Sequence, residues 1–108
     1  MATRYRADCS AANVSGGSTA EPVYEVLYQV PSGCIAKLTY LNGTASAHIV
    51  ISKDGGETKL QAITISSSNQ NYVDWGVYFN EGDILYLESS TTGSKYAFMC
   101  VILEYEED

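Results

Sequence analysis

The feature that most constrains this fold is a regular succession of short strand-like segments and turn residues from Val23 onward. Segments of alternating apolar and polar residues recur about every 8–12 residues, as in sandwiches of antiparallel sheets. No segment of about ten residues or more shows a 3.6-residue period, so we expect almost no helix. The chain should therefore be all-β, an antiparallel β-sandwich of roughly seven to eight strands.

Turn residues divide these segments because Gly, Asn and Asp tolerate positive φ and Pro fixes a bend. The expected turns are 31–33, 42–43, 54–56 and 80–83, and the expected strands are 23–30, 34–41, 47–52, 59–65, 72–79, 84–88 and 96–105. Alternation assigns a shared face to Tyr24, Val26, Tyr28 and Val30, and inward positions to Ala36, Leu38 and Tyr40.

Residues 1–22 differ from the remainder because they are rich in Ala, Ser, Gly, Thr and Asn. A segment with so few large apolar side chains cannot build a core of its own. We expect an extended N-terminal arm at 1–22 and a sandwich domain at 23–108. The arm would be a loose terminus or would order on a neighbouring subunit, and in the second case Arg4, Tyr5 and Arg6 are its expected contacts.

The segment 96–105 is apolar on both faces. Alternation places on one face Ala97, Met99, Val101 and Leu103, and on the other Tyr96, Phe98, Cys100 and Ile102. A strand of this kind usually has both sides covered. One side is the domain's own core, and a loop, the N-terminal arm or another subunit covers the other. We expect a homo-oligomer, a dimer or trimer, that buries Tyr96, Phe98 and Ile102.

The net charge is −7, and the six basic residues are scattered along the chain. Binding to nucleic acid or to an anionic membrane needs clustered Lys and Arg, so neither partner is expected. The sequence also lacks a run of about 18 apolar residues that would span a bilayer.

Cys9, Cys34 and Cys100 form an odd set without a CxxC pair. Secreted disulfide scaffolds have more cysteines, in even number. We expect Cys34 and Cys100 to be buried and Cys9 to be an exposed thiol, while one disulfide between two of them stays open. No apolar leader follows Met1, which favours synthesis in a reducing cytoplasm.

Motifs for catalysis and for cofactors are missing from the sequence. His48 is the single histidine, and no nucleophile elbow, zinc-ligand spacing or phosphate loop is present. Asp54, Glu57 and Asp83 could offer oxygens to calcium but do not form its usual loop, and Asp74 with Asp83 is a weak carboxylate pair for glycoside hydrolysis. We expect no catalytic residue, metal or cofactor, and a protein that is not an enzyme.

Sugar binding remains as an alternative. The stretch 69–72 and Asp74 combine a ring with amide and carboxylate groups, the residue types that glycan sites on sandwiches use. The expected contacts in that case are Asn71, Tyr72 and Asp74. The other interpretation is a polar loop that leads into a core strand.

Two stretches and the closing strand carry a family resemblance. They are Val30-Pro31-Ser32-Gly33 with Ala36 to Asn42, Phe79 to Leu87 with its Gly82-Asp83 pair, and the last strand ending in Glu104-Tyr105. Over residues 23–105 the chain resembles small virion structural proteins of tailed bacteriophages that have an Ig-like or jelly-roll-like β-sandwich.

That resemblance implies a role in the virion, with synthesis in the host cytoplasm. Such proteins decorate or cement capsids, or form parts of tails and fibres. The first expectation is therefore a capsid decoration (cement) protein that contacts the major capsid protein and its own copies. The alternatives are a tail-fibre or tail-tip module that binds a host glycan, and a non-viral interaction module.

Overall fold

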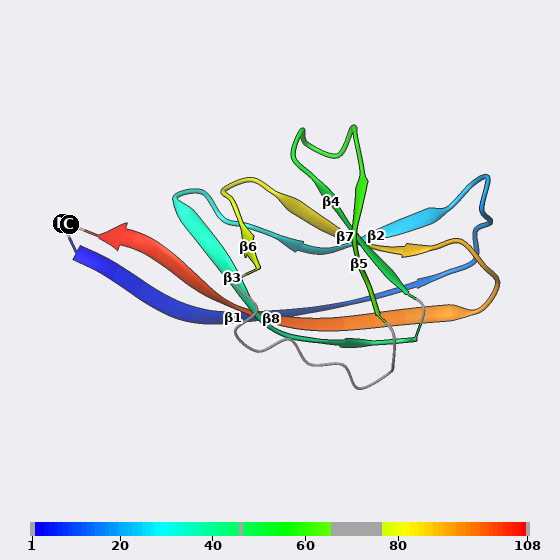
Figure 1. Cartoon of the computed structure of the whole chain (residues 1–108), viewed down its shortest axis with the longest axis horizontal. Helices are drawn as coiled ribbons and strands as arrows, with labels where there is room; N and C mark the ends of the chain where they lie inside the picture. Colours follow the sequence, from blue (N-terminus) through cyan, green and yellow to red (C-terminus); the bar gives the residue numbers. More distant parts are fainter. Residues whose placement is uncertain (1, 46, 66–76, 108) are drawn as a thin grey trace.

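The computed structural model describes residues 2–45, 47–65 and 77–107, and within them every regular element is a strand. The all-β prediction is confirmed (Figure 1). The strands are β1 (Ala2–Ser15), β2 (Val23–Gln29), β3 (Cys34–Gly43), β4 (His48–Ser52), β5 (Leu60–Thr64), β6 (Tyr78–Phe79), β7 (Ile84–Ser89) and β8 (Ser94–Glu107).

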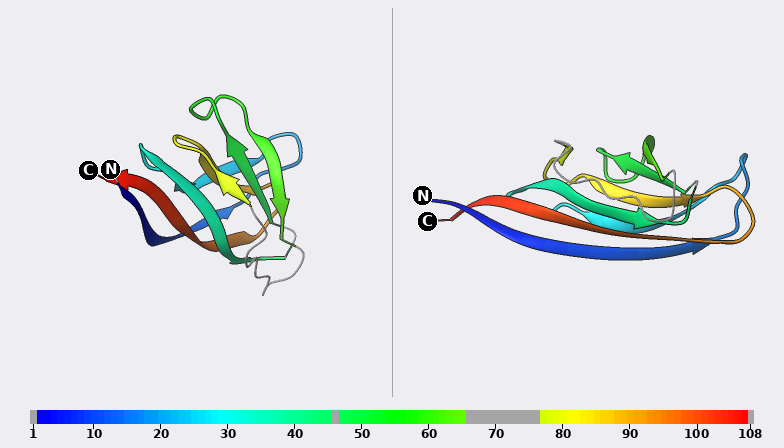
Figure 2. Two further views of the ribbon diagram at one scale, coloured as in Figure 1. Left: turned by 60° about the vertical axis from the view of Figure 1, so that its left-hand side comes forward. Right: turned by 60° about the horizontal axis from the view of Figure 1, so that its bottom comes forward.

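The strands form two antiparallel four-stranded sheets packed as two layers (Figure 2). The order in the first, here called sheet A, is β1-β8-β3-β6, and in the second, sheet B, it is β2-β7-β4-β5. β1 and β8 are the longest strands and pair over their whole lengths, from Ala2 opposite Glu107 to Ser15 opposite Ser94. Both chain ends therefore lie together at one end of the molecule (Figure 1).

The expected N-terminal arm is instead strand β1, so the prediction of an arm separate from the sandwich is corrected at residues 2–15. β8 supplies the reason, because its backbone offers hydrogen-bond partners along the full length of the segment. Small and polar side chains are tolerated at a sheet edge that buries little. Ala12 of β1 joins the core, and Val14 packs against it.

The core lies between the layers and is built from alternate residues of both sheets. Sheet A contributes Ala36, Leu38, Leu41, Ala97, Met99, Val101 and Leu103, and sheet B contributes Leu27, Tyr28, Ile49, Leu85 and Leu87. Burial of side chains this size is the main driving force for the fold. The inward positions expected for Ala36 and Leu38 are confirmed.

Two bulges contradict part of the prediction of which side chains point inward. The register of β3 against β8 shifts between Leu38 and Tyr40, so Tyr40 turns outward and Leu41 takes the buried place. The register of β2 shifts between Val26 and Tyr28, which leaves Val26 exposed. An extra residue in one strand reverses the alternation beyond it, and period-two patterning cannot anticipate that.

The turn expected at Asn42-Gly43 is also wrong, because β3 continues through Gly43. A side chain at Gly43 would lie 2.5 Å from the Tyr96 carbonyl oxygen and 2.7 Å from the Ile65 side chain. Glycine is needed here for close approach of the strands rather than for a positive φ. The turns at Gly55-Gly56 and Gly82 do have positive φ, as predicted.

Candidate functional site

The two faces of β8 differ sharply in exposure. Met99 and Leu103 point into the core and are almost fully buried, whereas Tyr96 is 44% and Phe98 39% exposed on the opposite side. Ile102 lies on that same outward side, half-buried. The structure therefore brings together the three side chains that the sequence marked for an oligomer contact, and in this single chain they face outward.

Neighbouring strands extend this outward surface across sheet A. Tyr5 of β1 and Ile35 of β3 both pair with Glu104 of β8, so their side chains lie in one row. The next row joins Ala7, Ile102 and Lys37. We call this surface the outer face; its large apolar side chains are Tyr5, Ile35, Tyr40, Tyr78, Tyr96, Phe98 and Ile102.

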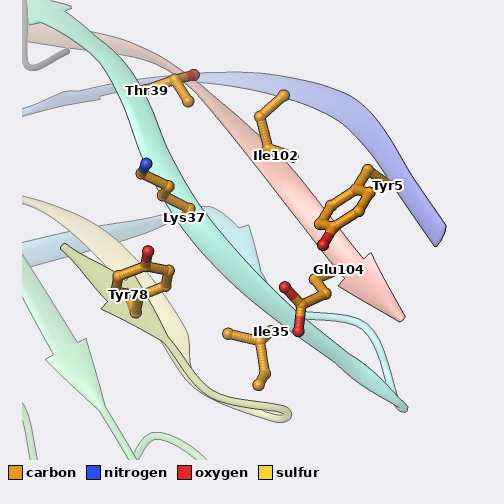
Figure 3. A pocket seen from close by; sticks show the side chains of 7 residues that line it. All are labelled: Tyr5, Ile35, Lys37, Thr39, Tyr78, Ile102 and Glu104. Carbon is orange, nitrogen blue, oxygen red and sulfur yellow. The ribbon is translucent and has the colours of Figure 1, made fainter. Parts of the chain in front are cut away.

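A shallow hollow of about 380 Å³ lies at the end of the outer face nearest the chain termini (Figure 3). Tyr5 and Tyr78 stand on its two sides, contributed by β1 and β6, and are 64% and 57% exposed. The remaining lining is Ile35, Lys37, Thr39, Ile102 and Glu104. The Lys37 ammonium lies 6.0 Å from the Tyr78 ring centre, at the limit for a favourable cation–π contact.

Aromatic packing stabilises the other end of the outer face. The rings of Tyr40 and Phe98 meet edge to face with centres 5.8 Å apart, a preferred geometry for aromatic pairs. The bulge orients the Tyr40 side chain outward, and this orientation brings its ring into contact with Phe98.

A disulfide joins Cys9 and Cys100 in the middle of the outer face. These residues are directly opposite each other in β1 and β8, with Cα atoms 4.1 Å apart. The disulfide left open by the sequence is thus between Cys9 and Cys100, and the expectation of an exposed Cys9 thiol is wrong. Cys34 is the free cysteine and is buried, as expected.

The three residues expected as arm contacts lie on β1 and diverge in role. Tyr5 belongs to the outer face, while Arg4 and Arg6 point to the other side. Arg4 lies 3.6 Å from the Glu107 carboxylate, and the Arg6 guanidinium stacks 5.7 Å from the Tyr105 ring centre.

The next inward side chain of β1 links the two sheets. The Tyr28 hydroxyl of β2 donates a hydrogen bond of 2.9 Å to the Asp8 carboxylate of β1. Burial, together with this bond, raises the pKa of Tyr28 well above its usual range. The bond anchors β1 to sheet B from the inside.

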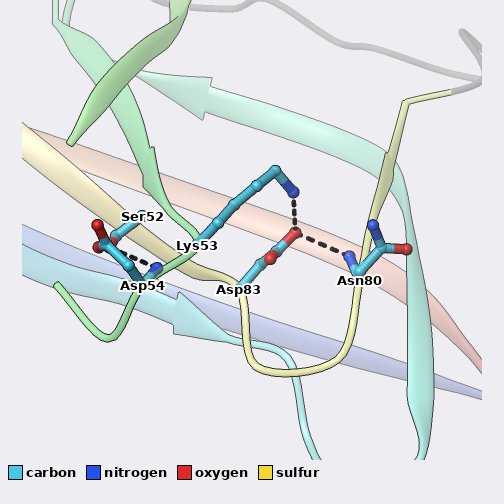
Figure 4. A network of polar contacts seen from close by, with 5 residues as sticks. All are labelled: Ser52, Lys53, Asp54, Asn80 and Asp83. Atoms are coloured by element: carbon cyan, nitrogen blue, oxygen red, sulfur yellow. Dashed lines mark hydrogen bonds and ion pairs between the residues drawn. The ribbon is translucent and has the colours of Figure 1, made fainter. Parts of the chain in front are cut away.

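Two of the carboxylates considered for calcium or hydrolysis, Asp54 and Asp83, have structural partners (Figure 4), while Asp74 lies outside the described residues. Asp83 accepts the Asn80 N–H at 2.9 Å and lies 2.7 Å from the Lys53 ammonium. Asp54 accepts the Ser52 hydroxyl and the Thr58 N–H, and the contacts from Thr58 and Ser52 lower its pKa to about 2. Among the described residues no three His, Cys, Asp or Glu side chains form a metal-binding group.

Asp83→Ala should lower the free energy of unfolding by about 1–3 kcal/mol, because it removes the buried Asp83 carboxylate that accepts the Asn80 N–H and thereby closes the turn. Lys53→Ala is the matched control. It removes the ion pair, in which the Lys53 side chain is 60% and the Asp83 side chain 6% exposed, but it leaves the Asn80 N–H with its acceptor. It should cost under about 1 kcal/mol, because solvent screens the exposed ammonium. Urea unfolding measures both. Equal losses would show that the ion pair, not the turn hydrogen bond, matters.

The remaining candidates give no further site. His48 lies half-buried on β4, with its Nδ1 3.3 Å from the Thr64 hydroxyl. Asn71, Tyr72 and Asp74, the expected glycan contacts, lie outside the described residues.

Sequence reasoning missed that Tyr5, Ile35 and Tyr78 share one surface with Tyr96 and Phe98. The available signal was the spacing of β1, in which Tyr5, Ala7, Cys9 and Ala11 alternate with mostly polar residues. Because residues 1–22 contain few large apolar side chains, this two-residue alternation was not recognised as a strand.

Comparison with protein-family models, with curated proteins and with solved structures finds no match to this chain. In the described part of the chain, no helix is long and apolar enough to cross a membrane.

Proposed function

We propose that this protein is a structural subunit of an assembled particle, concretely a capsid decoration protein of a tailed phage, and that it adheres through the outer face of sheet A. The observation that carries the proposal is the gathering of exposed Tyr5, Ile35, Tyr78, Tyr96 and Phe98 on that one face. Contiguous exposed apolar surface on a soluble domain marks an interaction site.

The residue types of the face favour a protein partner. Tyrosine and phenylalanine are enriched in the centres of protein interfaces, where they bury much area for little lost side-chain entropy. Lys37 and Glu104 lie among them and would fix orientation by pairing with polar groups of the partner. The partner we propose is the major capsid protein, from the sequence resemblance described above.

The mechanism differs from one based on a mobile arm. Residues 2–15 are paired with β8 and linked to it by the Cys9–Cys100 disulfide. They are therefore part of the sandwich and do not act as a separate arm. Adhesion is then by a rigid, preorganised sheet face, which loses little conformational entropy on binding.

The double substitution Tyr78→Thr with Phe98→Thr should weaken binding to empty capsid shells at least tenfold. Aromatic anchors of a protein interface contribute about 2 kcal/mol or more each, and threonine preserves strand propensity. The measurement is co-sedimentation of the purified chain with shells that lack it.

Val26→Thr with Leu60→Thr is the matched control, since both side chains are exposed on sheet B. That variant should bind shells as the wild type does. Equal loss in both variants would contradict a role of the outer face, and absence of wild-type binding to any shell would exclude the decoration role.

A second candidate is glycan binding in a tail fibre or tail tip, favoured by the hollow between Tyr5 and Tyr78. Two exposed rings beside the Glu104 carboxylate can stack on a sugar and accept its hydroxyls. A glycan array tests this, with Tyr5→Ala expected to abolish any signal. A blank array for the wild type would reject it.

A further inference from the structure

Strand β1 is an edge of sheet A, and the direction of its backbone groups can be deduced. The Cys9 and Cys100 Cα atoms are 4.1 Å apart, the short spacing of a non-hydrogen-bonded antiparallel pair. The other odd-numbered residues of β1 form non-hydrogen-bonded pairs with β8 as well, because the register is continuous. Their N–H and C=O groups therefore point away from β8, toward the open edge.

A local hydrogen bond supports this assignment. The Cys9 N–H donates at 3.1 Å to the carboxylate of the preceding Asp8, as a backbone donor that points away from β8 is able to do. The other odd-numbered residues in the first half of the strand, Thr3, Tyr5 and Ala7, are exposed. A long open edge of this kind is a template for a further strand.

We propose that the occupant of this edge is β1 of a second copy of this chain, paired antiparallel about a two-fold axis at Ala7. Charge complementarity within the strand itself favours a second copy over another partner. With Ala7 opposite its own copy, Arg6 of each subunit lies directly opposite Asp8 of the other. Both belong to non-hydrogen-bonded pairs, in which side chains approach most closely.

Neighbouring registers match less well. A shift that centres the axis on Asp8 places two Asp8 carboxylates opposite each other. A shift that centres it on Arg6 sets Arg4 of each subunit against Asp8 of the other, but it also opposes the two Arg6 guanidinium groups at the axis. An axis at Tyr5 sets Arg4 against Arg6, and an axis at Cys9 sets Asp8 against Ser10. Like charges directly opposite are destabilising, so the sequence of β1 selects the Ala7 register.

The pairing would join two sheets A into one continuous sheet. Thr3, Tyr5 and Ala7 would face Ala11, Cys9 and Ala7 of the second copy, and the odd-numbered pairs would exchange about ten backbone hydrogen bonds, two for each pair. The outer faces then lie side by side. This deepens the proposed function, on which it rests for its purpose, because a dimer presents two adhesive faces to one particle.

Charge reversal tests the register. Arg6→Asp and Asp8→Arg should each weaken dimerisation of the full chain at least tenfold, measured by sedimentation equilibrium across the micromolar range. Asp8→Arg also removes the acceptor of the Tyr28 hydroxyl, so Arg6→Asp is the variant that changes the interface charge and leaves that hydrogen bond in place. An equimolar mixture of the two variants should restore the dimer, because each substituted side chain would then face an opposite charge on the other variant. The chain that carries both substitutions should also dimerise. A monomeric wild type, or a dimer that neither reversal weakens, would overturn the proposal.

Ala7→Pro provides an independent test that does not alter charge. It removes an N–H that faces the open edge, where proline is tolerated, so the fold should persist while the dimer is lost. Retention of the dimer would refute the edge pairing. Shell binding separates the two proposals: Tyr78→Thr with Phe98→Thr should lose shells and keep the dimer, whereas Ala7→Pro should lose the dimer and keep single-chain contact with shells.

Discussion

Replacement of Cys9 by serine is expected to lower the free energy of unfolding by about 4–5 kcal/mol under oxidising conditions. The disulfide joins residues that are 91 positions apart, and closing a loop of that size removes a large part of the entropy of the unfolded chain. It also fixes β1, an edge strand whose side chains contribute little to the core. Guanidinium unfolding followed by far-ultraviolet circular dichroism measures the change.

Two controls isolate the disulfide from the substitution. A reducing agent should destabilise the wild type by a similar amount and leave Cys9→Ser unchanged. Cys9→Ser and Cys9→Ser with Cys100→Ser should have equal stability. A wild type whose unfolding midpoint is insensitive to reductant would contradict the assigned pairing.

Truncation of two adjacent residues of β8 should lower the free energy of unfolding by clearly different amounts. Met99→Ala is expected to cost about 2–5 kcal/mol of unfolding free energy, because Met99 is buried within the core and its truncation leaves a cavity there. Phe98→Ala should cost under about 1.5 kcal/mol, since it removes the ring contact with Tyr40 on a solvated face.

The same pair distinguishes stability from adhesion. Phe98→Ala should reduce binding to shells although the fold persists, whereas Met99→Ala should retain the affinity of its folded fraction. Urea unfolding and co-sedimentation provide the two readouts. A larger stability loss for Phe98→Ala than for Met99→Ala would indicate that Phe98 points into the core and Met99 outward. That result would contradict the assignment of Phe98 to the outer face.

The all-β class followed from the sequence because local signals were mutually consistent. Gly55-Gly56 and Gly82 favour turns through positive φ, and alternating segments between turns require one buried face. Strand boundaries such as Val23–Gln29 and Ile84–Ser89 accordingly lie within a residue or two of those expected.

The bulges could not be predicted from the sequence, and neither could the pairing of edge strand β1 with β8, despite the alternation of Tyr5, Ala7, Cys9 and Ala11. One extra residue near Thr39 turns Tyr40 outward, and nothing in the local pattern marks that position. Strand β1 depends on a partner strand far along the chain, since Ser15 pairs with Ser94 and Ala2 with Glu107. Its Ala and Ser residues carry no strand signal in isolation.

Only part of the outer face could be predicted from the sequence. Apolar residues on both sides of β8 require cover on each side, which identified Tyr96, Phe98 and Ile102. Tyr5 and Tyr78 join them only through strand order, because β1 and β6 lie at opposite edges of sheet A. Strand order is a long-range property that alternation does not encode.

The outer face of sheet A should be open in the free chain and covered in the particle. Tyrosine nitration read by mass spectrometry, on free and shell-bound protein, tests this most directly. Binding should protect Tyr5, Tyr78 and Tyr96, while Tyr24 of sheet B keeps the same reactivity in both states. Equal nitration of Tyr78 and Tyr96 in the two states would contradict adhesion through this face.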